Sequence, residues 1–385
     1  RRTPRALTFI DTWVADMMQF HKPTDGHETE HLHDMTDQES LVKLMSVGMH
    51  PIREQPAGSR QVRAANGQLT FATLPTLTFA NGHTYFIQRA PQSMGLRPFV
   101  VHATFQLGGN SGKRNRLREE HLWAADPPSY WSEGRFLGLA DAVPPELLVE
   151  TAGGSQLARH MRLISFYLHA THHLLSLARA LDRIPILPRM LCLCDRDEHP
   201  DVLPACTTSG TDLHLPFICP MDHVFDPNAW ESSGQAFRPN SFLESPFVPE
   251  ELRRSVVHIE LQDGRGRRRR HQLWHAGFVP DGNGGFWRRN AQRAMRNVLV
   301  ARSIKTATVS TIRERAGDAR VLVLSGIEMD TPYCADELDP AGAEELERLR
   351  ANLVWGTSWC CSDFDKNKGT HRFPHPSTFA PMRPC

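Results

Sequence analysis

The segment at residues 102–113 holds the groups best suited to binding a charged ligand. A strand-like run at residues 100–105 contains His102, and a glycine-rich stretch follows that includes Gly109 and Gly112 and ends in Lys113. Glycines lack a Cβ, so backbone amides there can approach a diphosphate closely, while the lysine supplies a mobile cation. An imidazole can bind a divalent metal that neutralises a departing nucleoside diphosphate. The pattern indicates a metal and diphosphate site, unless His102 is a core histidine and the glycines form a tight hairpin.

The residue pattern of this segment does not match two other kinds of phosphate-binding site, the P-loop and the dinucleotide-binding loop. Residues 108–113 read GGNSGK, and Arg114 follows the lysine where a P-loop requires serine or threonine. The glycine spacing of dinucleotide-binding domains is not present either. Kinase and dehydrogenase interpretations are therefore not favoured.

Several ordered blocks of the chain carry a family resemblance. They are residues 83–88 (HTYFIQ), 97–106 (RPFVVHATFQ), 112–119 (GKRNRLRE), 126–131 (DPPSYW), 216–226 (PFICPMDHVFD), 241–246 (SFLESP) and 356–361 (GTSWCC). These blocks resemble the nucleotide-diphospho-sugar transferases of plants and green algae. Within that group the similarity is to the arabinosyltransferases of hydroxyproline-rich, extensin-type glycoproteins.

The resemblance implies roles for particular residues. Such transferases are GT-A-like, retaining and metal-dependent, which implies that His102 is a ligand of Mn²⁺ or Mg²⁺. It also implies that an Asp-Gln pair, here Asp37 and Gln38, faces the donor sugar, although Val42 stands where an asparagine is common. The diphosphate contacts implied in this way are Gly109, Gly112 and Lys113.

The resemblance also implies substrates and a location. The expected reaction moves a pentose, arabinose, from a nucleoside diphosphate sugar, with UDP as the expected carrier, to glycans on a hydroxyproline-rich glycoprotein. The expected location is the Golgi lumen, with a membrane anchor outside this chain. The family's metal-binding DxD motif lies upstream of the helix that resembles residues 6–20, so we expect the chain to be the C-terminal part of a longer enzyme. The alternative is a non-catalytic, transferase-like binding or scaffold protein that lacks the DxD.

Other clusters are weaker candidates for a site. Asp195 and Asp197 form a DxD, but it follows His102, whereas in the GT-A fold the DxD precedes the histidine. The histidine-rich patch at residues 21–34 reads as a solvated loop, because polar stretches with proline and glycine usually are loops. His169, His172 and His173 share a helical face without an acidic partner nearby. The arginine run at residues 265–270 is not interleaved with aromatics for base stacking.

The elements that must position these residues alternate between helix and strand. Hydrophobic periodicity predicts helices at 6–20, 37–49, 156–181, 289–301 and 341–354, and strands at 68–74, 76–79, 99–105, 256–261 and 321–326. The apolar run at 184–194 predicts a buried strand and its exit loop. Turn formers at 126–145 favour a boundary near residue 145. We therefore predict an α/β protein with the C-terminal part of a GT-A-like domain at residues 1–140. A second, Rossmann-like α/β domain is predicted at 146–385, either fucosyltransferase-like or accessory.

The composition sets limits on partners and compartment. Lys plus Arg (44) nearly cancels Asp plus Glu (43), so the overall charge does not favour nucleic acid as a partner. Eight cysteines, all from residue 192 onward, permit disulfides without fixing a pairing. No apolar run reaches the roughly 18 residues that a membrane helix needs. Partners must therefore be inferred from local sites.

Overall fold

A computed structural model describes most of the chain. It covers residues 3–20, 36–52, 61–140, 143–148, 156–193, 213, 215–261, 298–301, 309–325, 344, 348 and 352–353. These residues belong to two compact units, Arg1–Pro75 (unit 1) and Thr76–Cys385 (unit 2), which are treated separately below. Among the helices in the described ranges, none is both long and apolar enough to cross a lipid bilayer.

Unit 1 consists of two helices and a small antiparallel sheet in the order β1-β2-β3. Its elements are α1 (Pro4–Phe20), α2 (Asp37–Ser46), β1 (His50–Pro51), β2 (Gln61–Ala64) and β3 (Leu69–Ala72). Both helices were expected from apolar periodicity. They are joined by polar contacts, since Asp16 on α1 accepts hydrogen bonds from Ser40 Oγ at 2.6 Å and Lys43 Nζ at 3.0 Å on α2. Such contacts fix the start of α2, where Asp37 and Gln38 lie.

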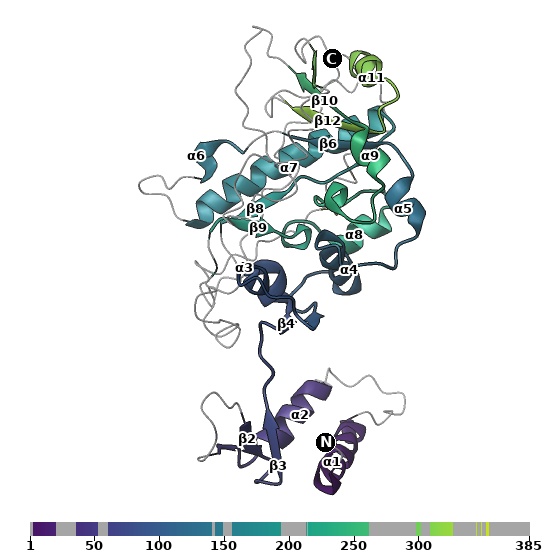
Figure 1. Cartoon of the computed structure of the whole chain (residues 1–385). Coiled ribbons are helices and arrows are strands. Elements are labelled where there is room, and N and C mark those ends of the chain that lie inside the picture. Colours follow the sequence, from purple (N-terminus) through teal and green to yellow (C-terminus); the bar gives the residue numbers. More distant parts are fainter. Residues whose placement is uncertain are drawn as a thin grey trace. The chain divides into compact units, whose positions relative to one another are not determined.

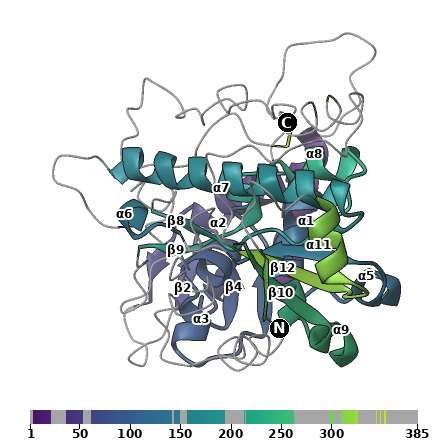
Figure 2. The same ribbon diagram turned by 90° about the horizontal axis from the view of Figure 1, so that it is seen from above.

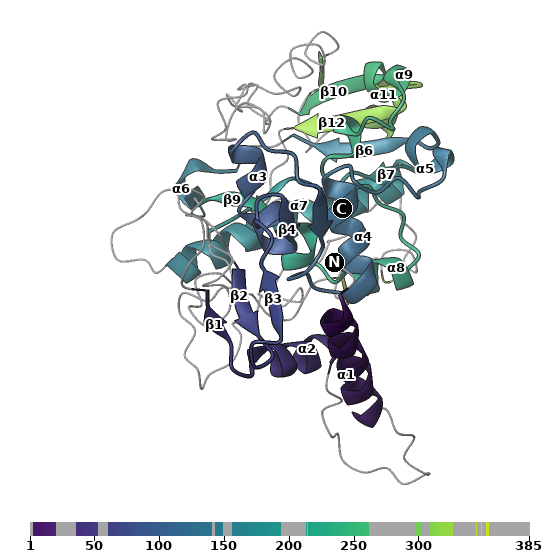
Figure 3. The same cartoon turned by 60° about the horizontal axis from the view of Figure 1, so that its bottom comes forward.

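Unit 2 is organised around a five-stranded sheet whose described pairings are all parallel (Figure 3). The strand order is β11 (Val298–Ala301), β10 (Val256–Leu261), β12 (Val321–Ser325), β6 (Phe136–Leu139) and β7 (Ile184–Pro185). The sequences VVHIEL and VLVLS are nearly continuous apolar runs, as parallel strands buried on both faces require. This confirms the predicted mixed α/β class with a parallel sheet.

Helices cover both faces of this sheet because successive strand residues point to opposite sides. Leu137 and Leu322 pack against α7 and α11, whereas their neighbours Phe136 and Val321 pack against residues of α5, η4 and α9. The bounds of these helices are α7 (Gln156–Ala180), α11 (Val309–Ala316), α5 (Pro128–Ser132), η4 (Phe242–Glu244) and α9 (Glu250–Arg254). Helix α7 has 25 residues and is seen from the side in Figure 2.

Further described elements of unit 2 contribute to an apolar cluster that includes the first half of α7. Two small sheets lie here, a parallel pair of β4 (Phe79–Asn81) with β5 (Val100–His102) and an antiparallel pair of β8 (Met190–Cys192) with β9 (Phe217–Cys219). The helical segments are η1 (His83–Ile87), α3 (Ala90–Ser93), α4 (Gly109–Glu119), α6 (Pro145–Leu148), η3 (Met221–His223) and α8 (Pro227–Ser232). One apolar cluster unites Ile87 of η1, Tyr167 of α7, Cys219 of β9 and Trp230 of α8. The arrangement of these elements can be followed in Figure 1.

Some of the expected elements differ from the structure. The apolar run at 184–194 forms two short strands in different sheets, β7 and β8, because Pro185 and Pro188 interrupt it. Residues 298–301 form strand β11 and not the end of a helix. The boundary expected near residue 145 lies inside unit 2, since β6 precedes it but pairs with β7 and β12, which follow it. Assignment of residues 1–140 and 146–385 to particular transferase domains stays a prediction.

Candidate functional site

His102 is the last residue of β5 and is exposed. The parallel pairing places it opposite Asn81 at the end of β4. Gly82, the residue that follows β4, donates its amide hydrogen to Thr104 Oγ1 at 3.1 Å. A Cβ on Gly82 would lie only 1.9 Å from the Thr104 carbonyl oxygen, so this approach of two backbones requires glycine. The backbone just after His102 is therefore held in place.

The turn from His102 to α4 adopts an unusual backbone conformation. Phe105 has φ +53°, which is strained for a bulky side chain, and Gly108 has φ +80°. Gly108 also lies against Pro227, whose Cδ would be 2.9 Å from an added Cβ. Gly112 packs on the turn itself, because a Cβ there would lie 1.7 Å from the Leu107 carbonyl oxygen. The glycines thus serve two close approaches and a left-handed turn.

The glycine-rich stretch is the first turn of helix α4 and not a hairpin. The first hydrogen bond of the helical ladder runs from the Gly112 amide to the Gly108 carbonyl at 3.1 Å. The amides of residues 109–111 precede it and therefore point out of the helix start, where Gly108 provides no side-chain cap. Free amides together with the positive end of the helix dipole make this position suited to an anion.

The charged side chains near this helix start differ in their partners. Glu231 of α8 accepts a hydrogen bond from Ser111 Oγ at 2.6 Å and forms an ion pair with Arg114 at 3.4 Å. Lys113 is half-buried and has no ion-pair partner within the described part of the chain. Its ammonium group is thus available for a bound anion.

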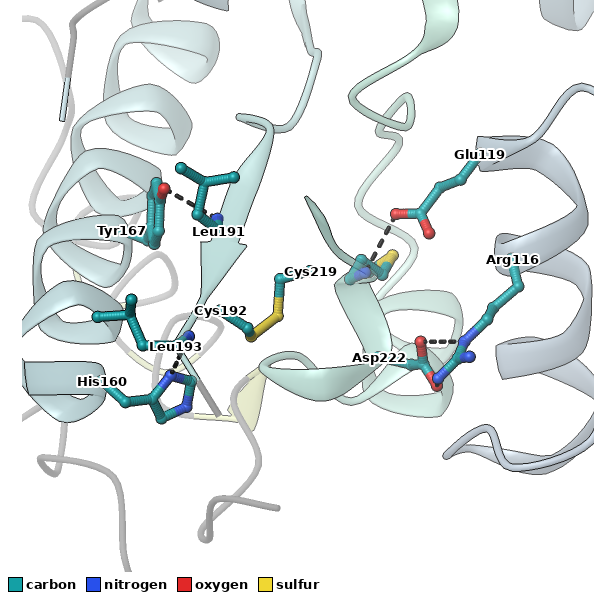
Figure 4. The surroundings of a disulfide bond; sticks show 10 residues. Arg116, Glu119, His160, Tyr167, Leu191, Cys192, Leu193, Cys219 and Asp222 are labelled. Atoms are coloured by element: carbon teal, nitrogen blue, oxygen red, sulfur yellow. Dashed lines mark hydrogen bonds and ion pairs between the residues drawn. A yellow bond between two sulfur atoms is a disulfide. The ribbon is translucent and has the colours of Figure 1, made fainter. Parts of the chain in front are cut away.

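A buried ion pair lies beneath the turn (Figure 4). Arg116 on α4 donates from Nε to Asp222 Oδ1 at 2.8 Å and from Nη2 to Asp222 Oδ2 at 3.0 Å, and each side chain is 1% exposed. The same two residues bind the turn, because Arg116 Nη2 donates to the Phe105 carbonyl at 3.2 Å and Asp222 Oδ2 accepts from the Leu107 amide at 2.8 Å. Charges taken out of water in this way need full pairing.

Glu119, one turn after Arg116, is half-buried. Burial raises the pKa of this carboxyl group to about 8, with a further increase from Asp222. Its Oε1 accepts hydrogen bonds from the Met221 amide at 3.1 Å and Asn240 Nδ2 at 3.3 Å. The group is therefore neutral at pH 7, and it joins α4 to η3 without adding a second buried negative charge beside Asp222.

A disulfide between Cys192 and Cys219 closes the β8–β9 pair and lies two residues before η3 (Figure 4). His223 is close to both sulfur atoms, with all three potential ligand atoms within 4.8 Å of one another. A disulfide has no thiolate to offer, so this group does not form a metal site in the oxidised protein. Its effect is to fix the strand that leads into Asp222.

The predicted site residues are divided between the two units. His102, Gly109, Gly112 and Lys113 belong to unit 2 and lie on one continuous strand, turn and helix. Asp37 and Gln38 belong to unit 1, where they start α2, are exposed and follow Thr36 in a capping box with Glu39. Asp37 Oδ1 accepts a hydrogen bond from the Gln38 amide at 2.8 Å.

No motif in the sequence predicts a role for Arg116, Glu119 or Asp222. A signal exists, because all three lie within two of the family-like blocks, residues 112–119 and 216–226. Charged residues on a helix are usually solvated, however, and the pairing joins positions 106 residues apart. Only the fold reveals that they meet.

Of the weaker candidates, the helix-borne histidines are described. His172 and His173 are buried on α7 with their rings 5.7 Å apart, which favours packing. Among the described residues, the metal-ligand group noted above includes neither of them and does not include His102. The histidine patch at 21–34, the pair Asp195 and Asp197, and the arginine run lie outside the described residues.

The chain is similar to a curated plant protein. It is 35% identical over 311 residues to arabinosyltransferase XEG113 of Arabidopsis thaliana, an alignment that takes in 78% of this chain and 44% of the relative. The chain therefore spans less than half the length of that relative. No family model matches the sequence. No solved structure matches it.

Proposed function

We propose that the chain belongs to the plant extensin-type arabinosyltransferase family and is a glycosyltransferase that uses a nucleoside diphosphate sugar. The observation that carries this proposal is the 35% identity over 311 residues. The exposed start of α4 supports it, because its amides and Lys113 offer the contacts that a diphosphate needs. The proposed donor is a UDP-linked pentose, arabinose, and the proposed acceptor is a glycan on a hydroxyproline-rich cell-wall glycoprotein.

The proposed chemistry concerns mainly the leaving group. The bond between the sugar C1 and the diphosphate oxygen breaks, and C1 bonds to an acceptor hydroxyl oxygen whose proton is released. Negative charge grows on the diphosphate, so preorganised amides and a cation near it lower the barrier. Gly109, where an added Cβ would meet nothing within 4 Å, leaves room for this close approach, and Lys113 supplies the cation. Gly112 faces the Leu107 carbonyl instead, and its amide donates to Gly108. Asp37 and Gln38 are proposed to hydrogen-bond the donor sugar.

A divalent cation, Mn²⁺ or Mg²⁺, is part of the proposal. His102 is exposed at a strand end and offers one imidazole ligand. A hard cation needs several oxygen ligands, and within the described ranges no ligand group of three includes His102. The described residues therefore do not make a complete site by themselves, and no catalytic step is assigned to the metal.

The finer fold and the location are likewise proposals. The parallel pair β4–β5 and the start of α4 are assigned to the latter part of a GT-A-like domain, and the five-stranded parallel sheet to a Rossmann-like domain. Both assignments rest on fold-level analogy. The Golgi lumen is the proposed compartment, and the Cys192–Cys219 disulfide is compatible with an oxidising environment of that kind.

A sugar-transfer assay on the full-length protein tests this function. UDP-arabinose, UDP-xylose and UDP-glucose are offered with an arabinosylated hydroxyproline-rich peptide, and the product is identified by mass spectrometry. We expect pentose transfer from UDP-arabinose and a loss of about tenfold or more in Gln38→Ala. Lys43→Ala on the same helix, whose side chain pairs with Asp16, is the matched control. A protein that binds UDP but transfers no sugar is the non-catalytic scaffold.

A further inference from the structure

The turn between His102 and α4 is held at two backbone atoms by side chains from outside it. Arg116 Nη2 binds the Phe105 carbonyl, and Asp222 Oδ2 binds the Leu107 amide. Phe105 has the positive φ of a strained residue, and such conformations persist only where surrounding contacts enforce them. The two anchors lie on either side of Gln106, immediately before Gly108.

The two anchoring side chains also fix each other. Their ion pair is bidentate and 1% exposed on both sides, so neither group has a solvated alternative. The chain just before Asp222 is also held in place. The Met221 amide donates a hydrogen bond to Glu119, and Cys219 is covalently joined to Cys192 (Figure 4). Asp222 thus connects the turn to the β8–β9 pair of unit 2.

We infer that Arg116 and Asp222 are positioning residues that hold the turn at residues 105–108 so that the amides of residues 109–111 are preorganised for a diphosphate. This inference rests on the proposed function. Preorganised dipoles bind charge without reorganising, so a loosened turn loses affinity for the anion. A purely structural ion pair would lower stability without changing the ligand contact.

Conservative variants separate these two roles. In Asp222→Asn, one amide oxygen replaces a carboxylate that accepts from Arg116 Nε, Arg116 Nη2 and the Leu107 amide. In Arg116→Lys, the ammonium cannot reproduce the planar bidentate geometry. The matched control is the ion pair between Arg118, on the same helix, and Asp126, which follows the helix. Its hydrogen bonds are 2.8 and 2.5 Å long, and the two side chains are 13% and 7% exposed.

The control pair is also an arginine–aspartate ion pair, but it lies away from the turn. Arg118 binds Asp126 and lies over the Tyr130 ring at 4.8 Å, with no hydrogen bond to residues 103–108 within the described structure. Arg118→Lys and Asp126→Asn therefore remove a partly buried ion pair from α4 and leave the turn anchored. Their loss of stability calibrates that of the test variants.

The experiment measures amide hydrogen exchange at single residues and UDP affinity by calorimetry, on the full chain. In the wild type we expect the Leu107 amide to exchange at least about tenfold more slowly than the Asn110 amide, which precedes the helical ladder. In Asp222→Asn and Arg116→Lys we expect Leu107 exchange to rise about tenfold and the UDP Kd to rise about tenfold. The control variants should change neither quantity.

The results test the positioning role of Arg116 and Asp222 separately from the proposed function. Leu107 exchange no faster in the test variants than in the controls overturns the positioning role, as does faster exchange with an unchanged Kd. If the test variants do not fold, equal exchange of Leu107 and Asn110 in the wild type overturns it. A wild type that binds no UDP refutes the proposed function. In that case, comparing Leu107 amide exchange between the test and control variants still shows whether the Arg116–Asp222 pair holds the turn.

Discussion

Glu119 shows how burial changes the charge state of a side chain beside the candidate site. Its carboxyl group is enclosed between α4 and η3, next to Asp222 and Arg116, and desolvation raises its pKa from 4.5 to about 8. The unfolded chain releases this proton near pH 4.5, whereas the folded protein keeps it. Its contribution to stability is therefore full below pH 4.5 and is lost as the pH rises towards 8.

This predicts a pH-dependent difference between wild type and Glu119→Gln. Glutamine stays neutral and can accept the same hydrogen bonds from Met221 and Asn240. We expect the variant to gain stability relative to wild type between pH 5 and 8, by a few kcal/mol, since one pKa unit corresponds to about 1.4 kcal/mol. Denaturant unfolding at several pH values measures this, with the exposed Glu133→Gln as control. A constant difference across that range would show that Glu119 ionises normally.

At the residue scale, residue type and spacing were enough to propose several candidate site residues. His102, Gly109, Gly112 and Lys113 could be proposed because strand, glycines and lysine follow one another along the chain. The glycines were assigned to ligand approach, yet Gly112 is required by the Leu107 carbonyl and Gly108 by Pro227. Such contacts depend on neighbours brought together by folding, which no local pattern reveals.

The β8–β9 hairpin is the element that connects the core to the site. Met190 and Cys219 lie opposite each other in its register, and Tyr167 Oη of α7 accepts a hydrogen bond from the Leu191 amide at 2.9 Å. β9 leads directly into η3, which carries Asp222. The β8–β9 pair therefore helps to position Asp222, and through Asp222 the turn before α4.

Loss of the disulfide is expected to destabilise unit 2. It closes a loop with a sequence separation of 27 residues, which predicts a cost of about 2–4 kcal/mol for Cys192→Ser with Cys219→Ser. Denaturant unfolding of the double variant measures this. Peptide mapping without reductant should recover the two cysteines in one linked fragment. Recovery of both as alkylated thiols would contradict the assignment.

The long helices and the apolar strands at 256–261 and 321–326 could be predicted, whereas several other short elements could not. The helices at 6–20 and 156–181 appear as α1 and α7 because their apolar spacing persists over many residues. The run at 184–194 looked like one buried strand, but prolines divide it between two sheets. Apolar runs alone also misassigned residues 298–301, because helix and strand are not distinguished by hydrophobicity over four residues.

At the scale of the whole molecule, a parallel sheet sets the architecture of unit 2. Its α/β class followed from alternating helical and strand-like segments, whereas its extent did not. Turn formers at 126–145 resembled a linker, yet β6 lies among them and pairs with β12, 185 residues later in the register. Strand pairing across such a distance is decided by tertiary packing, so the boundary expected near residue 145 lies within a compact unit.

The central claim is that the start of α4 in unit 2 binds the diphosphate of a nucleotide sugar. Calorimetric titration of UDP into the full-length protein tests it most directly, with Lys113→Ala as the test variant. Arg114→Ala is the control, since this neighbouring cation is paired with Glu231. We predict binding by the wild type, a Kd about tenfold higher for Lys113→Ala and little change for the control. Absence of UDP binding, or equal affinity in Lys113→Ala and wild type, would contradict the account.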